Sequence, residues 1–178
     1  MGKTAVATET DPQTTWQPAA DVLHQLLLDA ILKDNPIPAA YRISYVANFY
    51  VGPLVAQMEK SFKLTRAEWI VLFCLTQQAR LNAQQISVVT GRPKTSIAGA
   101  IKQLQKKKLI TRKADIADRR RRVLHMTDAG RNLYRAILGK FISREADMLA
   151  GLNSGEQQLL IRLIDKIIKG DRTWAKPY

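Results

Sequence analysis

The feature that most constrains the fold is a segment between Asn82 and Lys107 that carries start and stop signals for two closely spaced helices. Asn82 suits a helix N-cap, and Gly91 suits a helix end. Pro93 suits the first turn of a second helix, because the N–H group it lacks would be unsatisfied there. Two short helices joined by a tight turn predict a helix-turn-helix. Apolar residues recur at helical spacing, and those expected to face inward are Ile86, Val89, Ile97, Ala100, Ile101 and Leu104.

Helices and a hairpin are expected on either side of this segment. Residues 109–113 and 122–126 alternate between apolar and polar types, which predicts two strands with a polar tip between them. Capping boxes are expected at Thr65–Glu68 and Ser154–Gln157, Thr127 is expected to cap a helix, and Gly52-Pro53 predicts a kink or a break. The other helices are expected over residues 19–32, 39–62, 65–78, 127–149 and 154–169.

The predicted fold is therefore mainly α-helical with a small β-hairpin wing. The flanking helices carry more apolar surface than a small winged domain covers, so we expect them to bury it in a two-fold homodimer. The expected organisation is a flexible arm (1–18), N-terminal helices for dimerisation and an effector pocket (19–62), a winged helix-turn-helix lobe (63–127) and C-terminal dimerisation helices (128–178).

The basic charge is concentrated in the same part of the chain. Residues 91–122 contain twelve Lys or Arg against two Asp, a net charge of +10, while the whole chain carries +13. With a pI near 10.1, this concentration indicates a polyanionic partner, either nucleic acid or an anionic membrane surface. No apolar run approaches the ~20 residues of a transmembrane helix, and no signal-peptide pattern is present, so we expect a cytoplasmic protein.

The sequence carries no recognisable catalytic or metal-binding pattern. There is no HExxH, no P-loop and no glycine-rich dinucleotide loop. His24 and His125 are far apart, and Cys74, the only cysteine, lies in an apolar stretch where we expect it to be buried. An intrachain disulfide and a cysteine-based zinc site are excluded. We therefore expect a protein that is not an enzyme and that uses no metal and no cofactor.

Several motifs, in this order and spacing, resemble the multiple antibiotic resistance regulator (MarR) family of winged-helix transcription factors. They are Leu64-Thr65, Ile86–Gly91, Lys94–Ile97, Leu104–Ile110, Asp118–Arg120 and Leu124–Gly130. The resemblance implies a homodimer that binds a pseudo-palindromic DNA operator and is often released by a small molecule. The chain departs from the family pattern at two positions. Family members usually carry Gly where Lys108 stands and an apolar residue where Arg122 stands.

A recognition helix presents its N-terminal residues to base edges in the major groove. The residues expected to contact DNA from this helix and the turn before it are Arg92, Lys94, Thr95, Ser96, Ala98, Gly99 and Lys102. Gly99 has three open interpretations: close backbone approach to DNA, room for an adjacent helix, or a poor surface residue. At the far end of the helix, Lys106 and Lys107 are interpreted as a solvated terminus.

The hairpin tip supplies the other expected DNA contacts. Arg119 and Arg121 suit phosphates, and Arg120 suits a narrow minor groove. The resemblance implies the same role for Arg120 and implies that Asp118 holds the wing by pairing with a nearby guanidinium. Arg122 would share a face with Leu124 and Met126, so we expect it to stabilise the wing by packing its stem or by pairing with Asp118.

Aromatic residues are concentrated in the helices before the helix-turn-helix, which favours an effector pocket for an aromatic carboxylate, a phenol or an acyl thioester of such an acid. The alternative is that these rings only fill the core between helices. The candidate effector-binding residues are His24, Tyr41, Arg42, Tyr45, Phe49, Trp69 and Phe73.

Three functions compete. The first is a dimeric, sequence-specific, ligand-released transcriptional regulator, which we interpret as a repressor. The second is a ligand-independent architectural or general nucleic-acid-binding protein. The third, a peripheral membrane protein, ranks last, because the basic residues lie on a helix-turn-helix and a hairpin rather than on an amphipathic helix.

Overall fold

The structure is a computed structural model that describes residues 17–115, 120, 122–171 and 173–175. Its contacts divide the chain into two compact units, Met1–Asn48 and Phe49–Tyr178, with helix α2 crossing the boundary. The expected order of helices and hairpin is confirmed. The elements are α1 (Gln17–Lys33), α2 (Pro38–Phe62), α3 (Arg66–Gln77), α4 (Ala83–Thr90), α5 (Lys94–Lys106), β1 (Ile110–Ala114), β2 (Arg122–Met126), α6 (Asp128–Leu149), α7 (Ser154–Lys169) and a short 3₁₀ helix (Thr173–Ala175).

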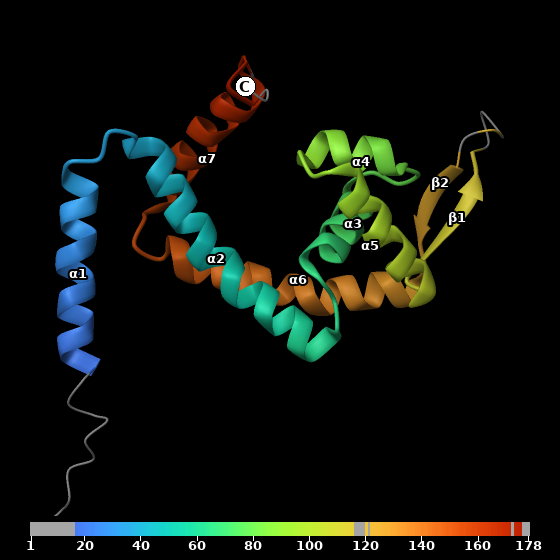
Figure 1. Cartoon of the computed structure of the whole chain (residues 1–178), viewed down its shortest axis with the longest axis horizontal. Coiled ribbons are helices and arrows are strands. Elements are labelled where there is room, and N and C mark those ends of the chain that lie inside the picture. The colour runs from blue at the N-terminus through green and yellow to red at the C-terminus, as the bar shows by residue number, and fades with distance from the viewer. Residues whose placement is uncertain (1–16, 116–119, 121, 172, 176–178) are drawn as a thin grey trace, which may run out of the picture. The chain divides into compact units, whose positions relative to one another are not determined.

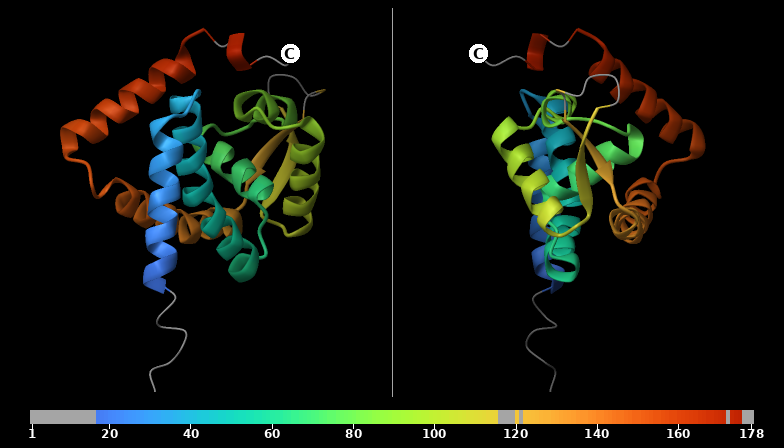
Figure 2. Two further views of the ribbon diagram at one scale, coloured as in Figure 1. Left: turned by 60° about the vertical axis from the view of Figure 1, so that its left-hand side comes forward. Right: turned by 90° about the vertical axis from the view of Figure 1, so that its right-hand side faces the viewer.

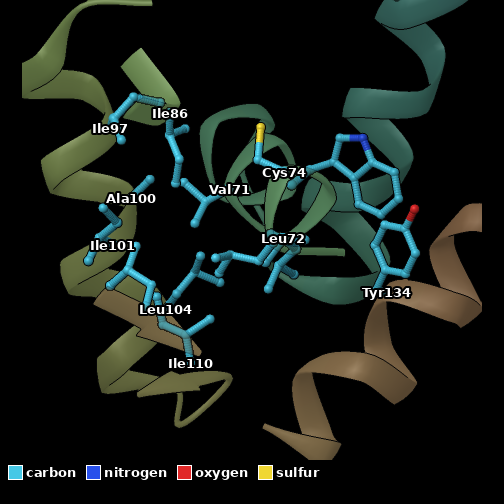
Figure 3. Packing of buried hydrophobic residues seen from close by; sticks show 14 of the residues in the cluster. Val71, Leu72, Cys74, Ile86, Ile97, Ala100, Ile101, Leu104, Ile110 and Tyr134 are labelled. Carbon is cyan, nitrogen blue, oxygen red and sulfur yellow. The ribbon is translucent and has the colours of Figure 1, made fainter. Parts of the chain in front are cut away.

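The core of the second unit lies where α3, α4, α5 and the hairpin meet. Val71 and Leu72 of α3 point toward the apolar faces of α4 and α5 (Figure 3), and both are fully buried. The α4 and α5 side of this core consists of Ile86, Ile97, Ala100, Ile101 and Leu104. Five of the six residues expected to face inward are therefore buried. The expectation for Val89 is wrong, because its side chain is 67% exposed.

The hairpin is a two-stranded antiparallel sheet in which Ile110 pairs with Met126 and Ala114 pairs with Arg122. It extends alongside α5 in Figure 1 and in both views of Figure 2, and β1 packs against α5. Ile110 and Leu124 are buried, while the rest of β1 is exposed. The root of the hairpin is therefore part of the core, and its outer half projects from the lobe.

Side-chain caps define where several helices begin. Thr65 with Glu68 and Asn82 with Gln85 form complete capping boxes, and Thr127 caps α6 by accepting a hydrogen bond from the backbone N–H of Gly130. The last capping box is displaced by one residue from its expected position. Asn153, rather than Ser154, is the N-cap of α7, and its partner is Glu156. Asn is at least as good an N-cap as Ser, so two adjacent cap residues competed at this position.

A partly buried ion pair joins the end of α5 to the start of α3. The Nζ atom of Lys107 lies 2.6 Å from the Oε1 atom of Glu68 and also donates to the backbone carbonyl of Lys63. Glu68 is 1% exposed, and the backbone N–H of Thr65 donates to its other carboxylate oxygen. Lys107 is exposed at the end of the helix, as expected, but its ammonium group is paired with a carboxylate from a residue 39 positions earlier.

Helix α2 continues through Pro53 without a break. A proline has no N–H group, so the carbonyl of Phe49, one turn earlier, lacks its usual partner. The guanidinium of Arg144 on α6 donates to this carbonyl and to that of Tyr50. The hydroxyl of Tyr50 in turn donates to the carbonyl of Phe141. These bonds satisfy the backbone at the proline and fix this part of α2 to α6.

Lys108 follows α5 in a left-handed conformation, with φ at 57°. We expect Lys108→Gly to raise the free energy of unfolding by about 0.5–1 kcal/mol. Glycine removes the strain that the Cβ atom causes in the folded state, and the greater freedom that it gives the unfolded chain offsets part of this gain. Urea unfolding at a fixed protein concentration measures the change. The control is Lys106→Gly, which removes the same charge from an ordinary helical position and is expected to destabilise by about 1 kcal/mol. Equal effects of the two variants would contradict the strain argument.

Candidate nucleic-acid interface

The first two turns of α5 present the expected DNA-contacting residues to solvent. Lys94, Thr95, Ala98, Gly99 and Lys102 are exposed, and Ser96 is half-buried. The opposite face of α5 is the buried one, so the core packing orients the polar face outward. The N-cap residue is Pro93, which makes no side-chain cap bond. The N-cap residue therefore accepts from none of the first-turn N–H groups, which suits a phosphate at this helix end.

Gly99 is exposed, and a Cβ built at this position meets no atom within 4 Å. The interpretation that Gly99 makes room for an adjacent helix of the same chain is thereby wrong. Two interpretations remain, a close approach of DNA to the backbone and a poor surface residue.

If DNA approaches the backbone closely at Gly99, replacing this glycine should change stability and DNA affinity in opposite directions. We expect Gly99→Ala to raise the free energy of unfolding by about 1 kcal/mol, because alanine is the better helix former. We also expect it to weaken DNA binding roughly tenfold, because its methyl group would occupy space that the DNA needs. Thermal unfolding and fluorescence anisotropy measure the two effects. A stabilised variant with unchanged affinity would make Gly99 a poor surface residue only.

The turn between α4 and α5 carries the half-buried Arg92. The hydroxyl of Ser87 donates to the backbone carbonyl of Arg92 at 2.7 Å, which holds the turn against α4. Partial burial lowers the pKa of the Arg92 guanidinium from its usual value, and the positive charge of Arg66 lowers it further. Arg92 remains charged at neutral pH. A nearby anion would relieve both effects, so this position favours a phosphate.

The basic tip of the hairpin is only partly described. Arg120 lies in the turn and is exposed. Arg122 is the exposed first residue of β2 and lies on the same face as Leu124, as expected. The expected contacts of Asp118, Arg119 and Arg121, including a pairing of Asp118 with Arg122, lie outside the described residues.

A shallow groove of ≈ 340 Å³ separates α5 from the hairpin. Three basic side chains from three elements line it: Lys102 of α5, Arg112 of β1 and Arg122 of β2. Its lining also includes Ala98, Ile101 and Leu124. Arg112 had not been predicted as a site residue, because the one available signal, a basic residue in a predicted strand, does not indicate which face of the strand it occupies.

Three of the candidate effector residues in the first unit lie together. The hydroxyl of Tyr45 is 3.4 Å from the Nε2 atom of His24, and the rings of Tyr41 and Tyr45 are 6.2 Å apart. Arg42 is used differently. Its guanidinium donates to the backbone carbonyls of Leu32 and Pro38 and so ties the end of α1 to the start of α2.

In the second unit, Trp69 is 6% exposed and lies between two parallel rings. Its centroid is 5.0 Å from that of Tyr134 and 4.6 Å from that of Phe141. Both faces of the indole are therefore covered, and a ligand would reach only its edge. Phe73 lies 6.5 Å from Trp69, and both Phe73 and Phe49 are exposed.

Other chemistry receives little support from the described part of the chain. Within it, no group of three His, Cys, Asp or Glu side chains could hold a metal ion. Burial raises the pKa of the Cys74 thiol, which disfavours the reactive thiolate. No described helix is both long and apolar enough to cross a membrane.

The helix-turn-helix, the hairpin and the basic residues around them define a winged helix-turn-helix DNA-binding protein. Residues 62–121 match the sequence model of the MarR family. The HTH-type transcriptional regulator YwaE of Bacillus subtilis is 26% identical over 144 residues, which cover 76% of this chain and 84% of YwaE. Over residues 62–121 the chain is therefore similar to the MarR family, and its fold and sequence likeness are those of a DNA-binding transcriptional regulator.

Solved structures share the fold. BpsR of Bordetella bronchiseptica, whose DNA binding is regulated by 6-hydroxynicotinic acid, superimposes with a TM-score of 0.65 at 23% identity, covering 79% of this chain and 96% of BpsR. MepR of S. aureus, in complex with DNA, has a TM-score of 0.66 at 22% identity, covering 76% of this chain and 98% of MepR. CouR of Rhodococcus jostii RHA1, bound to p-coumaroyl-CoA, has a TM-score of 0.67 at 20% identity, covering 77% of this chain and 94% of CouR.

Proposed function

We propose that this regulator binds a pseudo-palindromic DNA operator as a homodimer and acts as a repressor that an aromatic acid, a phenol or an acyl thioester of such an acid releases. The observation that carries the proposal is the exposed basic face of α5 beside a basic hairpin. In this arrangement the recognition helix enters the major groove, and Arg120 enters the adjacent minor groove. Lys102, Arg112 and Arg122 suit the backbone phosphates between them.

The apolar faces of α1 and α7 support the homodimer. The α1 face, formed by Val22, Leu23, Leu26, Leu27 and Ile31, is 45–63% exposed in the single chain. The α7 face is 37–56% exposed and consists of Leu159, Leu160, Ile161, Leu163, Ile164, Ile167 and Ile168. Contiguous apolar surface of this kind marks an interface, and a two-fold dimer is the commonest way to cover it.

Two observations support the class of effector. BpsR and CouR, which share the fold, are described with an aromatic acid and with an aromatic acyl thioester. In this chain, His24, Tyr41 and Tyr45 form a cluster of rings with a hydroxyl and an imidazole, a combination that suits a phenol or an aromatic carboxylate.

Selection from a randomised duplex pool, followed by footprinting, tests the operator. We expect a two-fold symmetric site with half-sites about 34 Å apart, the length of one helical turn. Two chains are expected per duplex in sedimentation measurements. Recovery of no symmetric site, with a ratio of specific to non-specific affinity below about 10³ at fixed salt, would favour the alternative of a general nucleic-acid-binding protein.

A thermal-shift screen of aromatic acids, phenols and their thioesters, followed by anisotropy of bound operator DNA, tests the effector. A true effector is expected to raise the melting temperature and to release the DNA, because it binds one conformation better than the other. Tyr45→Phe, which removes only the hydroxyl that faces His24, is expected to weaken this response. Compounds that stabilise the protein without releasing DNA would count against ligand-controlled repression.

A further inference from the structure

The connection between α3 and α4 contacts both strands of the hairpin. At the end of β1, the Nη2 atom of Arg80 lies 3.1 Å from the Oδ1 atom of Asp115. On the other strand, the backbone N–H of Leu124 donates to the carbonyl of Leu81 at 2.9 Å. Two adjacent residues of the connection therefore hold β1 and β2 at once.

The contact made by Arg80 is the one nearer the tip. Ala114 pairs with Arg122 at the outer end of the described sheet, and Asp115 is the next residue of the chain. The Asp115 side chain is only 18% exposed although it lies on a projecting hairpin. The ion pair thus acts at the outer end of the described hairpin, five residues before Arg120.

The backbone at Arg80 indicates that its side chain matters. Its φ of 68° is left-handed, a conformation that favours glycine. Backbone conformation alone would place glycine at position 80. The arginine instead directs a guanidinium to a residue 35 positions later in the chain.

We propose that Arg80 and Asp115 are positioning residues that form a brace between the helix-turn-helix and the wing. The brace sets the direction of the hairpin in the free protein, so that its basic residues meet a DNA duplex already aligned with α5. Binding then loses less conformational entropy than it would with a freely pivoting hairpin. The proposal rests on the DNA-binding function above, and it concerns DNA affinity rather than stability, because surface ion pairs stabilise folds only weakly.

Asp115→Asn separates the brace from simple electrostatics. The variant keeps the shape of the side chain and adds one unit of positive charge, so counterion release alone predicts equal or tighter DNA binding. The brace predicts the opposite, a roughly three- to tenfold loss of operator affinity from the lost preorganisation. The control is Asp147→Asn, which removes one negative charge from an exposed position of α6. No loss of operator affinity is expected for this variant. Operator binding by Asp115→Asn as tight as that of the parent would overturn the proposal.

Arg80→Gly separates positioning from folding. Glycine relieves the left-handed backbone, so the melting temperature is expected to rise while operator affinity falls. Lys63→Gly is the matched control, because Lys63 also has a left-handed backbone, with φ at 51°, and carries the same charge. It is expected to raise the melting temperature and leave operator affinity unchanged. If the two variants lose operator affinity equally, Arg80 contributes only its positive charge, and the brace is overturned.

Amide hydrogen exchange of the free protein tests the brace without DNA. We expect the amides of residues 112–114 and 122–124 to exchange faster in Asp115→Asn than in the parent, while those of α5 stay unchanged. Unchanged hairpin exchange would overturn the brace. If the parent protein binds no duplex specifically, the proposed operator function fails, while the exchange result still decides whether the ion pair orders the hairpin.

Discussion

Gly130→Ala is expected to lower the free energy of unfolding by about 3 kcal/mol, and the melting temperature by several degrees, at a fixed protein concentration. A Cβ at position 130 would lie 2.2 Å from the backbone carbonyl oxygen of Leu109 and 2.8 Å from the Cγ atom of Met126. The oxygen belongs to the backbone and cannot move alone, so the start of α6 would have to separate from the hairpin.

The cost is large because this junction is tightly bonded. The backbone N–H and the hydroxyl of Thr127 both donate to the carbonyl of Leu109, and the hydroxyl lies within bonding distance of the Lys108 carbonyl as well. The N–H of Gly130 donates to the same hydroxyl at 3.1 Å. A displaced α6 would lose several of these bonds together.

Gly139→Ala is the matched control for this prediction. It makes the same change in the same helix, but a Cβ at position 139 meets no atom within 4 Å. The free energy of unfolding is expected to stay unchanged or to rise by up to about 1 kcal/mol, as for alanine in any helix interior. Similar destabilisation by the two variants would show that dimer packing, rather than the contact with Leu109, controls the effect.

Arg120→Ala is expected to weaken operator binding by roughly tenfold to a hundredfold and to reduce the dependence of affinity on salt by about one counterion. The arginine lies exposed in the hairpin turn, where a minor groove would receive it. The loss is expected to be larger for operators with A/T-rich flanks, because their narrow minor groove attracts a cation more strongly. Anisotropy titrations over a range of salt concentrations measure both effects.

The control for Arg120 is Lys140→Ala, which removes one exposed positive charge from α6. Its salt dependence and its preference for A/T-rich flanks are expected to match those of the parent protein. If the two variants lose affinity equally on every duplex, Arg120 contributes only net charge, and the groove-inserting role is wrong.

Local features of this protein were predictable because their causes are local. Helix caps such as Thr65 and Asn82 and the glycine after α4 each depend on residues within one or two turns. The displaced cap at Asn153 shows the limit of this reasoning, since two adjacent good caps differ too little for sequence to decide between them.

The candidate interface was predictable to a similar extent. The basic face of α5 follows from helical periodicity, because the buried residues determine which positions remain for solvent. Arg80, Asp115 and Arg112 were missed, since their importance depends on pairings between residues far apart in the chain. The exposure of Val89 was also missed, because periodicity indicates which residues share a face but not how wide a face the neighbouring helices cover.

By itself, then, the sequence determined the order of elements, the caps that begin them and the concentration of positive charge on the helix-turn-helix and hairpin. Each of these results from short-range backbone geometry or from simple charge. The tertiary structure alone decided that Lys107 neutralises the buried Glu68, that Trp69 is enclosed between Tyr134 and Phe141, and that Arg80 reaches Asp115. These contacts join distant segments, and only the packed core brings the segments within a few ångströms of each other.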